Sequence, residues 1–165
     1  IAKHFEEQGY KNFGIVSGPG DAVDAVFRKN GFVDHISEKE DLKLVWEYKG
    51  DFSSESGRDA FNDYKNQNIP NMAIFGCNDH TCFGFMKEAL EAGYKIPKDF
   101  IIAGYDNLSF CDNFTPELTS VATNFDILGK RAIRTIENMV NDSNEIIRQF
   151  SMVPVEIVIR SSTQN

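Results

Sequence analysis

With 165 residues and an apolar content of 41%, including 14 Phe, the chain is long enough to bury the core of one globular domain. Lys and Arg total 17 against 25 Asp and Glu, and the net charge of -8 argues against nucleic acid or an anionic membrane surface as a partner of this stretch. No apolar run approaches the roughly 20 residues that span a bilayer, and the start has neither an initiator Met nor the order of a signal peptide. We therefore expect a piece of a longer protein with no membrane partner.

Apolar periodicity predicts helices and strands in alternation. In chain order we expect a helix at 2–8, a strand at 12–18, a helix at 22–33, a strand at 42–50, a helix at 54–67, a strand at 71–76, a helix at 79–92, a strand at 99–107, a strand at 119–123, a helix at 125–142 and two strands at 148–154 and 155–163. Ser53 or Ser54 is expected to cap the third of these helices. Strands separated by helices form right-handed crossovers, so the predicted fold class is α/β, a parallel sheet with helices on both faces.

The three cysteines are odd in number and lie among apolar residues, at Cys77, Cys82 and Cys111. This pattern is typical of small buried side chains in a reducing compartment rather than of a disulfide framework. We therefore expect a cytoplasmic protein with free cysteines.

Polar residues follow several of the predicted strands, where an open α/β sheet binds its ligands. These strand-end groups are Gly18 to Asp24, Gly50 to Ser53, Asn78-Asp79 and Asp106-Asn107. A neutral, hydroxyl-rich ligand needs donors and acceptors in fixed positions and an aromatic face against its C–H surface. The residues that meet this need are Arg28, Asn78, Asp106 and Phe52.

Each of these residues also has a structural role open to it. Those roles are an i,i+4 ion pair of Arg28 with Asp24, a helix cap at Asn78-Asp79, a turn at Asp106-Asn107, and a core contact or helix-start staple for Phe52. Periodicity alone leaves the choice between structure and ligand open.

Other chemistries lack the residue spacing that they need. The Gly18-Pro19-Gly20 turn does not match a phosphate loop, and Asp21 would repel an anion there. Cys77, His80 and Cys82 suggest a metal site, but on a helix His80 and Cys82 lie about 200° apart. No GxSxG elbow occurs. We expect no metal, no cofactor and no catalytic residue.

Several segments, taken in order, match one family pattern. They are GYKNFGIVSGP at 9–19, RKNGF at 28–32, GDFSSESG at 50–57, the run from AIFGCNDH to GYDN at 73–107, FTPELTSV at 114–121, FDILGKRA at 125–132 and VPVEIVIRSST at 153–163. Together they resemble the effector-binding core of LacI/GalR-type transcription regulators, over nearly the whole chain.

This resemblance implies one lobe of a two-lobed, periplasmic-binding-protein-like fold that closes on a small molecule, expected to be a carbohydrate. Arg28 and Asp106 would hold ligand hydroxyls, Asn78 would bridge, and Phe52 would stack on the sugar face. Further effector contacts are implied at Asp24, Thr123 and Phe125.

The chain departs from the family pattern at two of its site positions, Asp24 and Thr123, and at the neighbouring Asn124. The family often has Gln where Thr123 stands and Pro where Asn124 stands, and it commonly has a small hydroxyl or neutral residue in place of Asp24. The identity of the effector, and whether it induces or co-represses, therefore stay open.

The resemblance also implies that a DNA-binding head and most of an amino-terminal lobe precede residue 1. Residues 1–10 and 124–150 would belong to that absent lobe, 11–123 would form the carboxyl-terminal lobe, and 151–165 would return to it. We therefore expect unpartnered apolar surface on residues 2–8 and on the helix from Phe125. On that helix the exposed residues would include Ile127, Leu128, Ile133 and Ile136.

Regulators of this family act as homodimers, so the resemblance implies a pairing surface on this lobe. The apolar candidates are Phe83, Met86, Leu90, Phe110, Cys111 and Phe114, for which plain core packing is the alternative, favoured at Phe83 and Met86. Effector would shift lobe closure and so move the distant DNA heads. Two rival functions are a solute-binding protein of a sugar transport system and an enzyme with Asp79 or Asp106 as general base.

Overall fold

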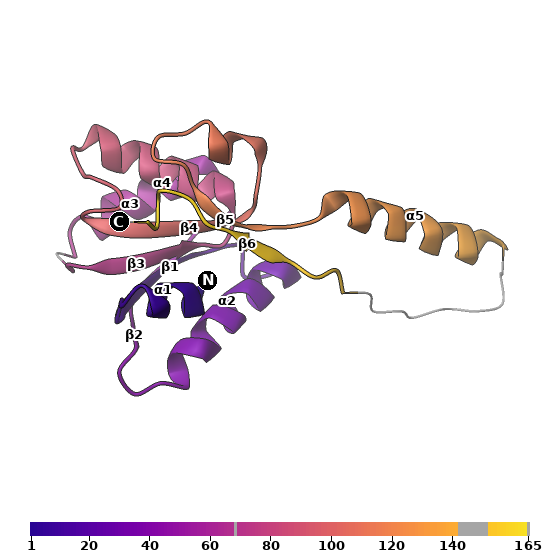
Figure 1. The fold of residues 1–165 in the computed structure, drawn as a ribbon, viewed down its shortest axis with the longest axis horizontal. Coiled ribbons are helices and arrows are strands. Elements are labelled where there is room, and N and C mark those ends of the chain that lie inside the picture. The colour runs from indigo at the N-terminus through magenta and orange to yellow at the C-terminus, as the bar shows by residue number, and fades with distance from the viewer. Residues whose placement is uncertain (68, 142–151, 165) are drawn as a thin grey trace.

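A computed structural model describes residues 1–67, 69–141 and 152–164 (Figure 1). Within these residues six strands form one sheet in the order β2-β1-β3-β4-β5-β6. The strands are β1 (Asn12–Ser17), β2 (Lys43–Lys49), β3 (Met72–Gly76), β4 (Phe100–Asp106), β5 (Thr119–Ala122) and β6 (Glu156–Val158). All neighbouring strands run parallel except β5 and β6, which are antiparallel.

Helices cover both faces of the sheet, with α3 and α4 on one face and α1 and α2 on the other (Figure 1). The helices are α1 (Ala2–Glu7), α2 (Val23–Ser37), α3 (Ser54–Tyr64), α4 (Asp79–Glu91), the 3-10 helix η1 (Ser109–Asp112) and α5 (Phe125–Asn141). The predicted fold class is therefore confirmed.

Two apolar clusters lie on opposite sides of the sheet. The cluster under α3 and α4 contains Phe61, Phe85 and Phe100, whose rings pack edge to face at 5.4 and 5.5 Å between centroids. The cluster under α1 and α2 contains Phe13 and Phe32 at a centroid distance of 6.0 Å. Because both faces of the central strands are covered, β3 is buried along its whole length, as its uninterrupted apolar run predicts.

Side-chain caps begin two of the helices that follow strands. Ser53 Oγ accepts a hydrogen bond from the backbone N–H of Ser56 at 3.0 Å, and Asn78 Oδ1 accepts one from Thr81 at 2.9 Å. Each cap satisfies an N–H that has no partner within the helix, which fixes where α3 and α4 start. The cap predicted near Ser53 is confirmed, and so is a capping role for Asn78.

Helix α1 packs onto the sheet instead of exposing apolar surface. Phe5 is 0% exposed and lies 6.3 Å from both the Phe13 and Phe32 ring centroids. Glu6 accepts hydrogen bonds from His35 on α2 at 2.8 Å and from Lys39 at 2.7 Å. The exposure predicted for residues 2–8 is wrong, because this short helix presents its few apolar side chains to the core.

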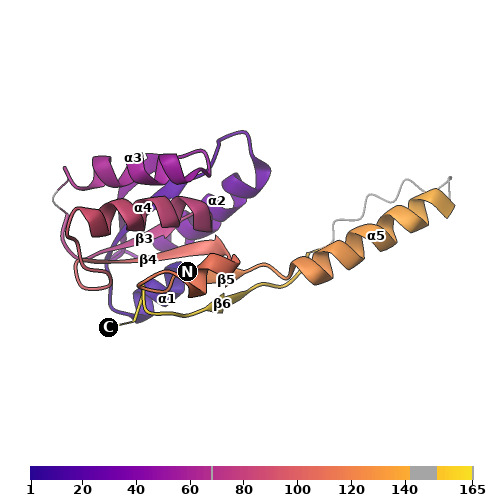
Figure 2. The ribbon, with the colours of Figure 1, turned by 90° about the horizontal axis from the view of Figure 1, so that it is seen from above.

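Helix α5 stands away from the rest of the chain in both views (Figures 1 and 2), and none of its residues is buried. Its apolar side chains are open to solvent, with Ile133 and Ile136 each 60% exposed. Ile127 and Leu128 are 37% and 44% exposed. The exposure predicted for these four residues is confirmed.

The end of the chain forms less strand than predicted. Residues 148–151 of the strand expected at 148–154 lie outside the described residues, and 152–154 form none. Beyond Val158, the N–H of Arg160 donates to Thr119 Oγ1 at 2.8 Å and the N–H of Thr119 donates to Ser162 Oγ at 2.8 Å. These side-chain bonds interrupt the pairing of β6 after three residues, and backbone pairing resumes where the N–H of Ser162 donates to Glu117 O at 2.9 Å.

Within the described ranges, none of the helices combines the length and the apolar character that crossing a bilayer requires.

Candidate functional site

Arg28 on α2 lies at the edge of the sheet where the parallel strands end. Its Nη2 is 3.3 Å from Asp24 Oδ2 and 3.3 Å from Asp106 Oδ1, and its Nη1 donates to the carbonyl oxygen of Cys77 at 2.7 Å. The ion pair with Asp24 is the predicted i,i+4 pair, but Asp106 comes from β4, 78 positions further along the chain than Arg28. One guanidinium therefore joins a helix to the ends of two strands.

Two aromatic rings lie beside the Arg28 guanidinium. Its Cζ is 4.0 Å from the centroid of the Tyr105 ring and 5.7 Å from that of Phe52. A guanidinium within about 6 Å of an aromatic ring is held by the ring quadrupole, and such contacts also stiffen the side chain. Our sequence reasoning missed Tyr105. The signal was the strand alternation of Ile101, Ala103 and Tyr105, which puts Tyr105 on the face covered by α2.

The backbone is strained at two of the predicted site residues. Phe52 has φ of 72° and Asp106 has φ of 114°, which side chains with a Cβ rarely adopt. Such residues cost about 1–3 kcal/mol each and cluster at functional sites. Asn78 Nδ2 donates to the Phe52 carbonyl oxygen at 2.9 Å, and a Cβ added at Gly18 would lie 2.3 Å from the Phe52 ring. The site therefore holds Phe52 in place from both sides.

The carboxylate of Asp106 has a strongly perturbed pKa. Burial, with a smaller contribution from the charges of Asp79 and Asp24, raises the pKa of this group from its ordinary 3.8 to about 6, against the opposing effect of the nearby Arg28. The side chain is only 19% exposed. A partly desolvated carboxylate next to a guanidinium is a strong acceptor for hydroxyl groups of a ligand.

Asn78 lies against the site, but its amide is largely occupied by structure. It caps α4 through Oδ1 and holds Phe52 through Nδ2, and the residue is 7% exposed. Of the seven sequence-predicted site residues, the structure thus brings five together. They are Asp24, Arg28, Phe52, Asn78 and Asp106.

Thr123 and Phe125 stand apart from these five. They line a hollow of about 550 Å³ between the end of β5 and residues 154–156. Because Ala122 is the register partner of Asp106, Thr123 is still on the same edge of the sheet. Within the described chain, the buried Thr123 Oγ1 has no hydrogen-bond partner. The described ion pairs, hydrogen bond and ring contacts of Arg28 involve neither of these two residues.

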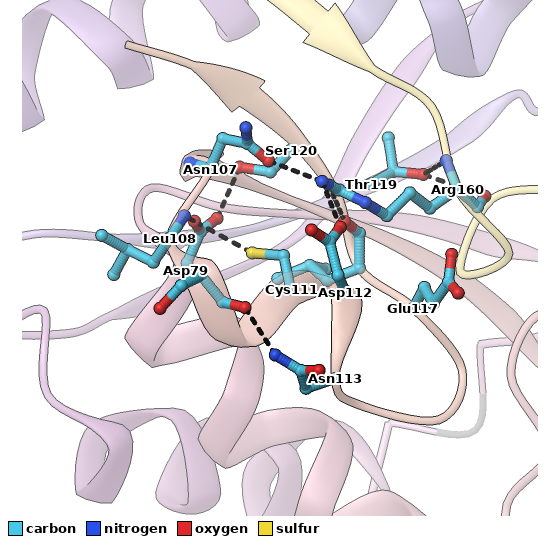
Figure 3. Close-up of polar contacts among 12 residues, drawn as sticks. Asp79, Asn107, Leu108, Cys111, Asp112, Asn113, Glu117, Thr119, Ser120 and Arg160 are labelled. Carbon is cyan, nitrogen blue, oxygen red and sulfur yellow. Dashed lines mark hydrogen bonds and ion pairs between the residues drawn. The ribbon is translucent and has the colours of Figure 1, made fainter. Parts of the chain in front are cut away.

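Asp79 is the centre of a buried network behind the site (Figure 3). Its carboxylate accepts hydrogen bonds from Ser120 Oγ at 2.6 Å, from the N–H of Leu108 at 2.8 Å and from Cys111 Sγ at 3.2 Å. Asp79 is 0% exposed, and burial raises its pKa. A side chain so enclosed cannot meet a substrate, so its role is structural.

Arg160, which sequence reasoning did not single out, connects the segment after β6 to the same network (Figure 3). Its guanidinium donates to Leu118 O at 2.7 Å and to Asn107 Oδ1 at 2.8 Å, and it pairs with Asp112 at 2.6 Å. The N–H of Asn107 in turn donates to Ser120 Oγ at 3.1 Å. Arg160 and Ser120 therefore fix Asn107, which adjoins the strained Asp106.

The cysteines do not form a reactive or metal-binding group. Cys77, Cys82 and Cys111 are free thiols and each is 0% exposed. Burial raises the pKa of the Cys77 thiol to about 12. Among the residues that the structure describes, no three His, Cys, Asp or Glu side chains are grouped so as to hold a metal ion.

A partly exposed aromatic group covers the outer side of α4 and η1. The Phe83 centroid is 5.4 Å from that of Phe110 and 5.1 Å from that of Phe114. Two other candidates for the pairing surface are core residues instead, because Met86 and Cys111 are each 0% exposed. Core packing, the alternative favoured for Met86 and left open for Cys111, is therefore confirmed for both residues.

Comparison with known proteins gives one consistent result. Residues 2–163 match the family model described as a periplasmic binding protein-like domain. The chain is 31% identical over 163 residues to the HTH-type transcriptional repressor PurR of Mannheimia succiniciproducens, covering 98% of this chain and 48% of that protein.

Solved structures agree with this match. A LacI family transcriptional regulator from Enterococcus faecalis with bound ribose is 25% identical, with a TM-score of 0.85, covering 98% of this chain and 57% of that one. The Lac repressor bound to ONPG is 23% identical, with a TM-score of 0.88 and coverage of 98% and 48%, and at this identity it shows the fold alone. The chain spans about half the length of the curated relatives that it matches.

Proposed function

The chain belongs to the periplasmic-binding-protein-like domain family and has the one-lobe fold of the effector-binding core of LacI/GalR-type regulators, and from this premise we propose that it binds a small-molecule effector for a DNA-binding transcriptional regulator. Its named relatives are transcriptional repressors, which favours a cytoplasmic regulator over a transport protein or an enzyme. The DNA would be contacted only by a DNA-binding domain outside this chain, because a stretch with a net charge of -8 would repel the phosphate backbone.

One observation carries the proposal: Arg28 is fixed between two carboxylates and two aromatic rings at the ligand-binding edge of the sheet. Asp106 and Asp24 would accept hydrogen bonds from ligand hydroxyls, while Arg28 would donate to ligand oxygens. Phe52 would lie against the C–H face of the ligand. Because a related structure holds ribose, a sugar is the proposed class of effector.

We assign residues 124–141 to the second lobe of the domain and residues 11–67, 69–123 and 152–164 to the lobe described here, and the rest of the segment predicted at 124–150 lies outside the described residues. The solvent-exposed apolar side chains of α5 support this assignment, because a helix of this kind is normally covered. Residues 1–10 are not assigned to the second lobe, since α1 packs on the sheet through Phe5. Effector bound between the lobes would favour the closed arrangement and so change the spacing of the DNA heads.

We also propose that two copies of the protein pair through the aromatic group of Phe83, Phe110 and Phe114. These rings pack on one another and stay partly exposed, as the centre of an interface does before pairing. Replacing Phe110 by Asp in the full-length protein should shift sedimentation from dimer to monomer. A variant that still sediments as the dimer would exclude Phe110 from the interface.

A thermal-shift screen of the full-length protein against sugars, sugar phosphates and purines tests effector binding. A ligand at 100 times its Kd adds about 2.7 kcal/mol to the free energy of unfolding, so a true effector raises Tm. Arg28→Ala and Asp106→Ala should abolish the shift, whereas Arg58→Ala, on the exposed side of α3, should keep it. Wild-type shifts in both site variants would refute the site.

A further inference from the structure

At the ligand-binding edge of the sheet, the starts of the helices carry acidic side chains of the chain itself. Free N–H groups at helix starts are the usual anchors for phosphate and carboxylate ligands at such an edge. Each described α-helix that follows a strand carries an acidic residue in its first turn, Asp24 in α2, Glu55 in α3, Asp79 in α4 and Asp126 in α5. One N–H group in the first turn of each of α3 and α4, that of Ser56 and that of Thr81, also donates to a side-chain cap. An anionic ligand at any of these helix starts would therefore meet a carboxylate of the chain itself.

Arg28 does not provide a free positive charge for an anionic ligand, because two carboxylates share its guanidinium. Its Nη2 faces Asp24 and Asp106 at 3.3 Å each, and its Nη1 is engaged by the Cys77 carbonyl oxygen. Of the five residues gathered at the site, Arg28 alone is basic, so with both carboxylates ionised the group has a net charge of about -1. What the site presents to a ligand is mainly acceptor oxygens.

Resting on the proposed function, we propose that this site selects its effector by charge: it takes a neutral or amino-bearing sugar and rejects sugar phosphates and sugar acids, and Asp24 sets that preference. Hydroxyl and ammonium groups are donors that match carboxylate acceptors, whereas a phosphate or carboxylate offers further acceptors and like charge.

Asp24, rather than Asp106, is the residue that reads the charge of the ligand. Its side chain is 58% exposed against 19% for Asp106, so it can contact an incoming group while keeping its bond to Arg28. Between an effective dielectric constant of about 20 for a protein surface and about 80 for water, repulsion between two like charges about 5 Å apart corresponds to a change in Kd of roughly fourfold to several hundredfold. Removing this one charge should therefore change the ranking of ligands without destroying the site.

Isothermal titration of the full-length protein with sets of sugars that differ only in charge tests this inference. One set is glucose, glucosamine and glucose 6-phosphate, with the matching galactose set and with ribose and ribose 5-phosphate beside it. The variants are Asp24→Asn and the matched control Asp34→Asn. Asp34 is an exposed residue near the other end of α2, so its replacement alters the net charge equally but away from the site.

The wild type should bind the neutral or amino member of a set at least tenfold more tightly than its phosphate. Asp24→Asn should narrow that ratio by roughly fivefold or more, and Asp34→Asn should leave it unchanged. A phosphate that binds the wild type as well as its parent sugar overturns the charge selection but leaves the proposed function standing. If neither variant changes the ratio of the Kd values of the phosphate and its parent sugar, or if both variants change it equally, Asp24 does not set the preference. A folded protein that binds no member of any set overturns the inference together with sugar binding.

Discussion

The guanidinium carbon of Arg28 lies 4.0 Å from the centroid of the Tyr105 ring, so a strand residue supports the cation that the site depends on. Contacts of this kind contribute about 0.5–2 kcal/mol, more where they are desolvated, and Arg28 is only 17% exposed.

We expect Tyr105→Leu to lower the free energy of unfolding by about 1–2 kcal/mol and Tyr105→Phe to change it by less than about 0.5 kcal/mol, because Phe keeps the ring. Urea denaturation of the two variants, combined in a double-mutant cycle with Arg28→Met, measures the coupling between the two side chains. A coupling energy near zero would show that the ring and the cation do not stabilise one another.

Asp106→Asn should raise stability at the same time as it removes effector binding. The pKa of Asp106 in the folded protein is raised to about 6 from its ordinary 3.8. Protonation of Asp106 therefore stabilises the folded protein. This stabilisation is fully present below pH 3.8 and is lost as pH rises through about 6. The neutral Asn avoids that loss. Its gain in the free energy of unfolding is at most about 3 kcal/mol, and it is smaller because the variant also loses the ion pair with Arg28.

The measurement is Tm against pH for the wild type and the variant. We expect the gain of Asp106→Asn to be largest at pH 8 and to vanish near pH 4. Asp126→Asn is the control, because the Asp126 side chain is 75% exposed. A gain for Asp106→Asn that is the same at pH 8 and pH 4 would contradict the raised pKa.

Arg160 should matter more for stability than its distance along the chain from the site suggests. Its side chain is 10% exposed, and Arg160→Ala would leave Leu118 O and Asn107 Oδ1 without their charged donor. Loss of such buried partners costs about 2–4 kcal/mol. Asp112→Ala should cost less than about 1 kcal/mol, because Asp112 is 63% exposed. Equal losses in urea denaturation of the two variants would place the role of Arg160 in the surface pair alone.

Sequence reasoning succeeded where one local signal decides the structure. The apolar run of β3 is buried on both faces, and the residues before α3 and α4 are caps, because each feature depends on neighbours within a few positions. It failed at α1, because the exposure was expected from the assignment of residues 1–10 to the absent lobe, whereas Phe5 packs on the sheet against Phe13 and Phe32. The short β6 was overestimated for a related reason: the side chains that end it come from Thr119 and Ser162, far apart in sequence.

The site was predictable in its residue types but not in its internal contacts. The resemblance gave Arg28 and Asp106, but only the fold shows that Asp24 and Asp106 share one nitrogen of Arg28. The positive φ of Phe52 and Asp106 is likewise invisible in sequence, since Phe rarely has a positive φ and Asp, although more tolerant, adopts one in only a small minority of cases. Strain of this kind persists only when the surrounding contacts over-determine it, and those contacts come from distant segments.

Gly84 sets how closely α4 approaches α3. A Cβ added at Gly84 would lie 1.9 Å from the backbone oxygen of Ser54, so the two helices would have to separate. Overpacking of this kind costs about 1–3 kcal/mol or more, and we expect Gly84→Ala to lie at the upper end because the clash is with backbone. Gly31, inside α2, is the matched control, since a Cβ there meets no described heavy atom within 4 Å apart from its chain neighbours and the backbone of its own helix. Gly31→Ala should raise stability by about 0.5–1 kcal/mol through helix propensity. Thermal unfolding should therefore move in opposite directions for the two variants, and a Gly84→Ala protein as stable as the wild type would mean that α3 and α4 are less closely packed than described.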